Sequence, residues 1–210
     1  MSDILHVMVQ KLYAGEIDEV VGLIQQALAQ DIDPDDILNQ GLLRGMDEVG
    51  KDFKAGDLYV PEVLVSARAM QAGMDVLRPH LAPESASGVG TFLIGTVKGD
   101  LHDIGKNLVK LMLEGAGYVG TDLGTDVPPE AFADAARKLQ PDIVAMSALL
   151  TTTMQHMRST IEALEDIGIR EQVKVLIGGA PVTSAFAEEI GADGYAPDAA
   201  RAVDVARSLT

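Results

Sequence analysis

The sequence predicts an α/β protein in two parts, a four-helix bundle followed by a flavodoxin-like, doubly wound parallel sheet. Two observations lead to this fold class. In residues 1–80 apolar side chains recur at helical spacing, whereas from residue 89 onward short apolar runs rich in β-branched residues alternate with helical stretches. Strands and helices that alternate along a chain are typical of a parallel sheet with helices on both faces.

The predicted bundle consists of helices joined by short loops. The opening helix covers residues 4–13, and a second helix begins after Glu16. The third helix has Asp33 as its N-cap and Pro34 at its first position, a pairing that favours a helix start. The fourth helix follows Pro61.

A linker is predicted at residues 79–90, where prolines, serines and glycines replace the helical pattern. We therefore expect a helical cap at residues 1–80 and a sheet domain at residues 89–210. Loop positions absorb the backbone changes of domain motions, so the linker is also the expected hinge.

The sheet domain is predicted to contain five strands and five helices. The strands are expected at residues 89–97, 118–123, 143–149, 173–177 and 194–196. The helices are expected at residues 104–116, 129–139, 154–167, 183–190 and 198–209. Five strands fit the order 2-1-3-4-5, in which ligands bind at the carboxyl ends of strands 1 and 3.

Composition excludes several kinds of function. The formal charge is −16, so phosphate backbones and anionic lipids are unfavourable partners, and neither nucleic acid nor membrane is expected. The absence of cysteine excludes disulfides, thiolate metal sites and cysteine nucleophiles. No secretory signal pattern and no apolar run of about 18 residues is present, which indicates a cytoplasmic protein.

The strongest candidate for chemistry follows the first predicted strand. Asp100, His102 and Asp103 lie there, at the expected ligand-binding edge. A neutral imidazole can ligate a transition metal through one nitrogen while its other nitrogen donates to a carboxylate, and Asp100 can be that partner. The alternative is that these residues only cap the following helix.

The ends of two further strands carry hydroxyl groups and glycines. These residues are Ser147, Thr151, Thr152, Thr153, Gly178 and Gly179. They would form the opposite wall and a side-chain-free ledge of one crevice. The alternative is that the hydroxyl groups are helix N-caps and that the glycine pair is a simple turn.

Taken together, the three segments resemble the signature DxHxxG…SxL…GG of cobalamin-dependent methyltransferases. Here it reads DLHDIG at residues 100–105, SAL at 147–149 and GG at 178–179. The chain is similar to the cap and B12-binding domains of cobalamin-dependent methionine synthase. It most resembles the separate corrinoid protein of three-component methyltransferase systems, because cap, linker and corrinoid domain account for all of its residues.

The resemblance implies a set of residues that contact the cofactor. In the sheet domain these are Asp100, His102, Asp103, Ile104, Gly105, Ser147, Leu149, Thr151, Thr153, Gly178 and Gly179. Residues 45–70 look like the family's cap, in which an aromatic and an aliphatic residue shield the methyl-bearing face of the corrin. Phe53 and Val60 match them, although the family often has Leu at the second position; both could also be plain core residues.

The cofactor implied by the resemblance is cobalamin or a related corrinoid. Its nucleotide base would leave the cobalt, and His102 would become the lower axial ligand and sole metal-binding residue of the chain. Asp100 and Thr153 would complete a relay with His102. A methyltransferase specific for a methylamine, methanol or a methoxylated compound would load a methyl group onto Co(I). A second methyltransferase would pass it from methyl-Co(III) to a pterin or thiol carrier, and a reductive activator would be a further partner.

Three alternatives remain. A B12-sensing module would need a segment that reads DNA, which the acidic balance does not favour. The small subunit of an adenosylcobalamin mutase shares DxHxxG, but the predicted cap speaks against the open upper face that a mutase needs. A flavodoxin-like domain without cobalt would stay colourless when mixed with cobalamin.

Overall fold

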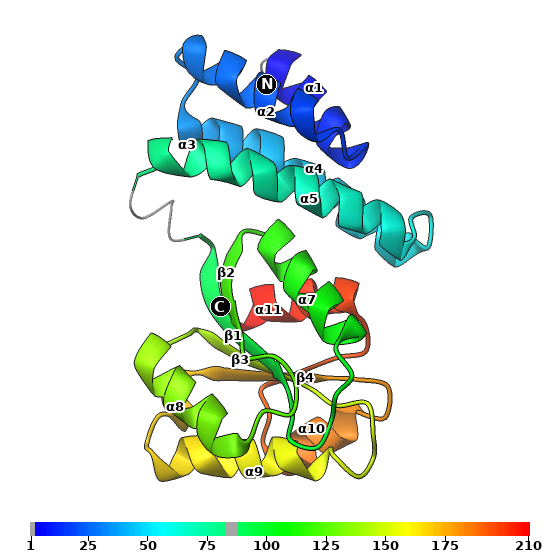
Figure 1. Ribbon diagram of the computed structural model, residues 1–210, viewed down its shortest axis with the longest axis vertical. Helices are drawn as coiled ribbons and strands as arrows, with labels where there is room; N and C mark the ends of the chain where they lie inside the picture. The colour runs from blue at the N-terminus through cyan, green and yellow to red at the C-terminus, as the bar shows by residue number, and fades with distance from the viewer. Residues whose placement is uncertain (1–2, 83–87) are drawn as a thin grey trace. The chain divides into compact units, whose positions relative to one another are not determined.

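A computed structural model describes residues 3–82 and 88–210. The chain forms two compact units, Met1–Val89 with Glu114–Gly117, and Gly90–Leu113 with Tyr118–Thr210. The first unit is helical and the second contains a parallel sheet (Figure 1), so the predicted α/β fold class is confirmed.

The first unit is a bundle in which α2 packs on α5 and α1 packs on α4. Its elements are α1 (Asp3–Tyr13), α2 (Ile17–Ala29), α3 (Pro34–Asp36), η1 (Ile37–Leu43), α4 (Arg44–Ala55), α5 (Val60–Leu77) and η2 (Arg78–His80). The predicted helix start holds, because the Asp33 side chain accepts a hydrogen bond from the Asp35 N–H at 2.9 Å and Pro34 follows it.

The third predicted helix contains a feature that periodicity missed. Residues 34–55 pass through η1, a π-helical segment with a wider turn than the α-helices on either side. Gly41 lies in this segment against Met8, where an added Cβ would stand 2.7 Å from the methionine sulfur. The glycine therefore allows α1 to approach closely.

The second unit has the predicted strand order, β2-β1-β3-β4-β5, with all neighbouring pairs parallel. The strands are β1 (Gly90–Thr96), β2 (Tyr118–Asp122), β3 (Ile143–Ser147), β4 (Lys174–Gly178) and β5 (Gly194–Ala196). The helices are α7 (Ile104–Gly115), α8 (Pro129–Leu139), α9 (Gln155–Asp166), η3 (Arg170–Gln172), α10 (Ser184–Ile190) and α11 (Ala199–Leu209).

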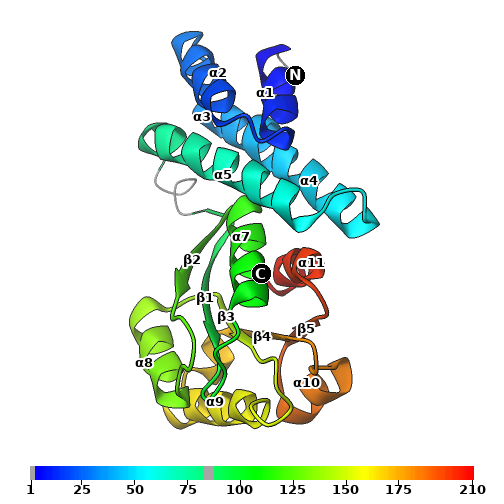
Figure 2. The same cartoon turned by 45° about the vertical axis from the view of Figure 1, so that its right-hand side comes forward.

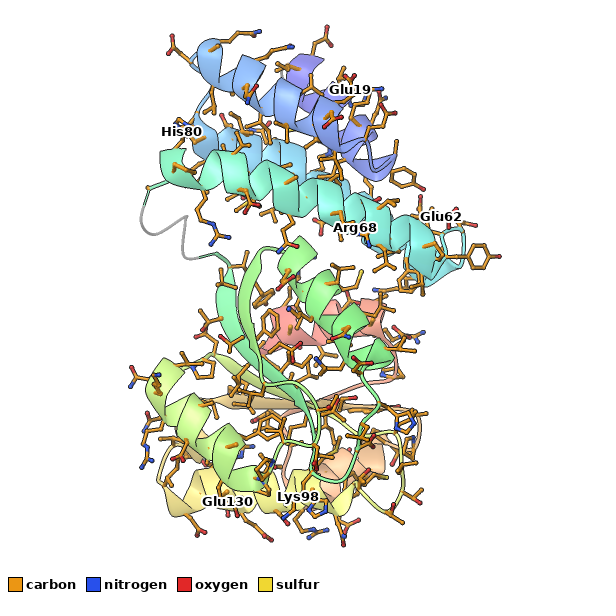
Figure 3. The ribbon with its side chains drawn as sticks, viewed as in Figure 1. Glu19, Glu62, Arg68, His80, Lys98 and Glu130 are labelled. Atoms are coloured by element: carbon orange, nitrogen blue, oxygen red, sulfur yellow. The ribbon has the colours of Figure 1, made fainter. Side chains whose placement is uncertain are left out.

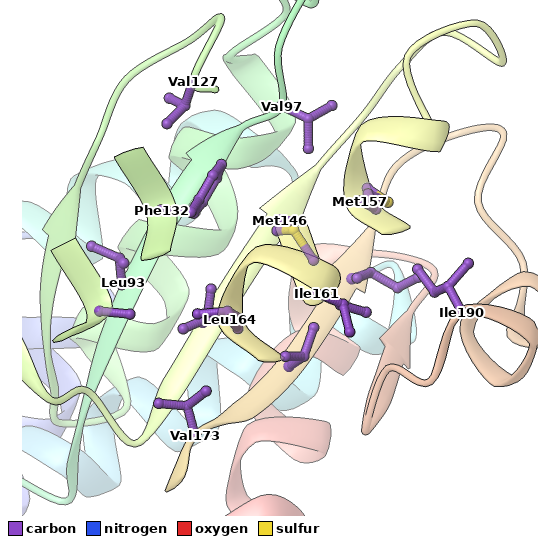
Figure 4. Packing of buried hydrophobic residues seen from close by; sticks show 14 of the residues in the cluster. Leu93, Val97, Val127, Phe132, Met146, Met157, Ile161, Leu164, Val173 and Ile190 are labelled. Atoms are coloured by element: carbon purple, nitrogen blue, oxygen red, sulfur yellow. The ribbon is translucent and has the colours of Figure 1, made fainter. Parts of the chain in front are cut away.

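Helices cover both faces of the sheet, as the doubly wound prediction requires. Helices α7 and α11 lie on one face, and α8, α9 and α10 lie on the other (Figures 1 and 2). The buried core between the sheet and α8–α10 consists of aliphatic residues and methionines together with one aromatic residue, Phe132, which is completely buried (Figure 4). Phe132 packs over Gly95, where an added Cβ would stand 2.7 Å from the ring.

The parallel register aligns the carboxyl ends of four strands. Thr96 pairs with Ser147, Ser147 with Gly178, and Gly178 with Ala196. The loops after β1, β3 and β4 therefore leave the sheet side by side, which is the arrangement that brings their side chains together.

Two expectations need comment. Strand β3 ends at Ser147 and not at residue 149, because the N–H groups of Leu149 and Leu150 turn toward Asp100. Of the predicted linker, the turn η2 includes residues 79 and 80, whereas residues 83–87 lie outside the described residues. No described helix combines the length and the apolar character that crossing a membrane requires.

Candidate functional site

The loop between β1 and α7 carries Asp100 and His102 at the carboxyl edge of the sheet. Lys98 of this loop lies at the same end of the sheet as Glu130 in the first turn of α8 (Figure 3). Gly99 has a φ of +79°, which starts the turn out of the strand. The completely buried Thr96 donates its hydroxyl to the His102 carbonyl at 2.8 Å, which ties the end of the loop to the end of β1.

Asp100 is completely buried and is the centre of the site's hydrogen bonds. Its Oδ1 accepts from the backbone N–H of His102 at 3.1 Å and lies 2.7 Å from His102 Nδ1. Its Oδ2 accepts from the Leu149 N–H at 2.7 Å, from the Leu150 N–H at 3.3 Å and from the Thr153 hydroxyl at 2.8 Å. One carboxylate thus joins the loops after β1 and β3.

The surroundings keep Asp100 ionised. Burial by itself raises the pKa of a carboxyl group, but hydrogen bonds from Leu149, His102 and Thr153 outweigh it and hold the pKa of Asp100 far below its usual range. An ionised carboxylate only accepts hydrogen bonds, so Nδ1 of a neutral His102 must carry the proton. Nε2 is then the nitrogen with a lone pair for a metal, and the side chain is 53% exposed.

The hydroxyl residues after β3 have different positions. Thr153 is buried against Asp100 and Leu150, whereas Thr151 and Thr152 are exposed and Ser147 is half-buried. Helix α9 begins at Gln155 with Met154 at its N-cap and no side-chain cap. The hydroxyl of Thr153 therefore donates to the Asp100 carboxylate and does not cap the start of α9.

The glycine pair at the end of β4 is explained by packing. An added Cβ at Gly179, whose φ is +135°, would stand 1.9 Å from the Ala148 carbonyl oxygen. One at Gly178 would stand 2.9 Å from the Ala196 carbonyl oxygen. Gly178 is thus required where the ends of β4 and β5 approach each other, and Gly179 where the loop after β4 approaches Ala148. Together they leave a stretch of backbone without side chains beside Ser147.

Large apolar side chains are exposed around His102. Leu101 is 73% exposed, Ile104 82% and Leu149 42%, although such residues are normally buried. An added Cβ at Gly105, in the first turn of α7, would meet nothing within 4 Å, so packing within the chain does not explain this glycine. An apolar rim around a single imidazole fits a large, partly apolar ligand.

The single imidazole of His102 suits a metal ion whose other ligands are supplied by a cofactor. Within residues 3–82 and 88–210 no group of three or more histidine, cysteine, aspartate or glutamate side chains is arranged to hold a metal ion. His102 would therefore offer one protein nitrogen, as a metal held in an organic macrocycle requires. The residues present fit a cobalt corrinoid.

Sequence reasoning missed two groups that support the loop. Lys106 is buried and donates to Asp122 at the end of β2, and this ion pair lowers the pKa of Asp122 against the raising effect of burial. Asp126 accepts from the Gly99 N–H at 2.7 Å. A lysine directly after the glycine of DLHDIG was the available signal for the first group. No signal pointed to Asp126, because its contact depends on the path of a loop.

The two predicted cap residues belong to the other unit. Phe53 is half-buried on α4, and Val60, the first residue of α5, is 38% exposed. Asp103 and Ile104 are exposed at the start of α7, and the Asp103 carboxylate accepts from the Asn107 side chain at 3.1 Å. The roles of all these residues toward a cofactor remain predictions.

Comparison with known proteins agrees with this geometry. Two family models, each described as a B12 binding domain, match residues 90–204 and residues 4–78. A dimethylamine corrinoid protein from Methanosarcina barkeri is 42% identical over 99% of this chain and 98% of its own length. The methanol:cobalamin methyltransferase complex from Methanosarcina barkeri contains a chain that matches with a TM-score of 0.89, 31% identity, 99% coverage of this chain and 80% of that one. A cobalamin-binding protein from Desulfitobacterium hafniense matches with a TM-score of 0.82 and 30% identity over the whole of both chains.

The fold and these matches define a B12-binding protein in which a helical unit precedes a flavodoxin-like unit along the chain. The chain belongs to the family of corrinoid proteins. The family resemblance read from the three sequence segments is thereby confirmed.

Proposed function

We propose that this protein is a methyl carrier that binds a cobalt corrinoid with His102 as the lower axial ligand. The observation that carries the proposal is the 2.7 Å contact between His102 Nδ1 and the buried, ionised carboxylate of Asp100. A carboxylate that accepts the distal N–H makes an imidazole a better ligand and fixes its orientation. When bound, the corrinoid supplies the cobalt centre that accepts and releases the methyl group.

The relay consists of three residues with separate tasks. His102 offers Nε2 to the metal, Asp100 holds the proton of Nδ1, and Thr153 donates to the far oxygen of Asp100 at 2.8 Å. Release of the imidazole from a metal would let it take up a proton, and the adjacent carboxylate would stabilise the resulting charge. These residues therefore suit a ligand that binds and leaves repeatedly.

Other residues would hold the cofactor without ligating it. The lower nucleotide arm would lie beside Ser147, Gly178 and Gly179, and Leu149, Thr151, Asp103, Ile104 and Gly105 would contact the corrinoid. Phe53 and Val60 of the helical unit would shield the upper face. A methyltransferase would load the methyl group, as the name of the similar methanol:cobalamin complex suggests, and a second methyltransferase and a reductive activator would complete the cycle.

Replacement of His102 by alanine tests the ligand role. We expect the variant to keep the spectrum of base-coordinated cobalamin, or to bind hydroxocobalamin about ten- to a hundredfold more weakly. His156→Ala, on α9, is the matched control and should bind as the unmodified chain does. Equal spectra and affinity for His102→Ala and the unmodified chain would refute the ligand role.

A separate experiment tests the carrier role against its rivals. The loaded protein, mixed with a methylamine or methanol and the methyltransferase that co-purifies with it, should become methylated and lose the methyl group to an added thiol or pterin acceptor system. A B12 sensor would bind the corrinoid without turnover. A mutase subunit would instead support isomerisation with adenosylcobalamin.

A further inference from the structure

The loop between β2 and α8 contains a residue in an unusual backbone conformation. Asp126 has a φ of +55°, and within the described residues only Asp31 and Gln140 among non-glycine residues share a positive φ. The left-handed region is unfavourable for a residue with a Cβ, and aspartate and asparagine tolerate it best. Such a conformation persists only where surrounding contacts hold it.

Two hydrogen bonds join Asp126 to the loop that carries His102. The Gly99 N–H donates to Asp126 Oδ1 at 2.7 Å, and the Asp126 N–H donates to the Asp100 carbonyl at 3.0 Å. The side chain and the main chain of Asp126 thus form hydrogen bonds with two consecutive residues, Gly99 and Asp100. The left-handed conformation of Asp126 lets its carboxylate and its backbone N–H point toward the same segment of the loop.

The loop of Asp126 is itself anchored. Asp122 accepts from the Gly124 N–H at 2.8 Å and from the buried Lys106, and the Val127 N–H donates to the Thr96 carbonyl at 3.0 Å. Asp126 therefore links a fixed turn to the loop that contains Gly99. Gly99 is exposed and has little conformational preference, and within its own loop the Asp100 N–H donates to the Val97 carbonyl at 3.1 Å. The hydrogen bonds of Asp126 add a support from a second loop to the backbone at residues 99 and 100.

We propose that Asp126 is a positioning residue that fixes the backbone of Gly99 and Asp100 so that the Asp100 carboxylate meets His102 Nδ1. A buried carboxylate can accept from its several donors only if its own Cα stays in place. The hydrogen bond that Asp126 accepts from Gly99 and the one that it donates to the Asp100 carbonyl restrain that Cα. The consequence for cobalt rests on the proposed function of His102, whereas the effect on the imidazole proton does not.

The test uses the tautomer of His102 in the protein without corrinoid. Nitrogen-15 NMR at alkaline pH, where imidazoles are neutral, distinguishes Nδ1–H from Nε2–H. In the unmodified chain we expect the Nδ1–H form, and in Asp126→Gly a shift of the population toward Nε2–H. Asp126→Asn retains a side-chain oxygen acceptor and tolerance of the left-handed turn, so it should restore the original tautomer.

A control and a second measurement keep the outcome interpretable. Asp31→Gly relieves the same φ of +55° in the helical unit and should leave His102 unchanged. Hydrogen exchange at the Gly99 amide should be slow in the unmodified chain despite the exposure of Gly99, and about tenfold faster or more in Asp126→Gly. The signals of His6, His80 and His156 report whether the variant is folded.

The proposal is overturned if Asp126→Gly leaves both the tautomer and Gly99 exchange unaltered, or if Gly99 exchanges freely in the unmodified chain. A different result would separate the two proposals. If the tautomer shifts as expected while His102→Ala has no effect on bound cobalamin, the positioning role of Asp126 is supported and the ligand role of His102 is refuted.

Discussion

Thr153 donates its hydroxyl to Asp100 Oδ2 at 2.8 Å, although the two residues are 53 positions apart in the chain. The parallel register makes this contact possible, because Thr96 at the end of β1 lies opposite Ser147 at the end of β3. The loops that follow these strands then face each other. A carboxylate from the first loop and a hydroxyl from the second become the far part of a relay that ends at His102.

Asp100→Asn should weaken corrinoid binding about ten- to a hundredfold, because an amide would present N–H donors to the five groups, from four residues, that donate to the Asp100 carboxylate. Titration with hydroxocobalamin, followed by absorbance, measures the affinity. Asp166→Asn is the control, since this exposed carboxylate is the last residue of α9 and belongs to no part of the proposed site. Unchanged affinity for Asp100→Asn would contradict the relay.

Thr153→Val should lower the free energy of unfolding by about 1–2 kcal/mol and also weaken corrinoid binding, because a buried donor to a carboxylate is lost. Thr153→Ser keeps the hydroxyl and should restore the affinity. Thr160→Val removes a matched buried hydroxyl, which donates to the His156 carbonyl at 2.8 Å. It should affect unfolding alone. Equal affinities for the two valine variants would show that the Thr153 hydroxyl has no part in binding.

The site should lose stability in acid. The folded-state pKa of Asp100 lies below its unfolded value of 3.8, so the unfolded chain takes up the proton first as the pH falls. The stabilisation is fully present above about pH 5 and decreases below about pH 4, toward the folded-state pKa. Urea unfolding at a series of pH values should therefore show a steeper acid decline for the unmodified chain than for Asp100→Asn. Parallel curves would mean that Asp100 does not contribute in this way.

Gly179→Ala should destabilise the sheet unit by several kcal/mol, because the new Cβ would overlap the Ala148 carbonyl oxygen in a backbone conformation reserved for glycine. Gly168→Ala is the matched control: its φ is also positive, at +74°, but its Cβ would meet nothing within 4 Å. That variant should lose only about 1–2 kcal/mol. Thermal melting compares the stability of the two variants. Similar losses of stability would mean that the backbone at Ala148 can move away from the new Cβ at little cost.

Much of the fold was predictable because the pattern of apolar residues is local. Helix α8 has the predicted bounds, Pro129–Leu139, and even the short strand β5 matches its prediction at Gly194–Ala196. The π-helical turn of η1 was not predictable, since one extra residue in a turn changes the spacing too little to be seen in a mixed apolar stretch. The early end of β3 depends on a distant carboxylate.

By itself the sequence determined which segments become strands and which residues follow them, because side-chain periodicity and glycine positions act over a few neighbours. That was enough to select Asp100, His102, Ser147 and the glycine pair as one edge of a parallel sheet. The family resemblance had already assigned Thr153, and not Thr152, to a relay with Asp100. Only the tertiary structure decided that the Thr153 hydroxyl donates to Asp100 Oδ2 and that Asp126 accepts from the Gly99 N–H. These contacts depend on the exact course of loops that are adjacent in space and distant in the chain.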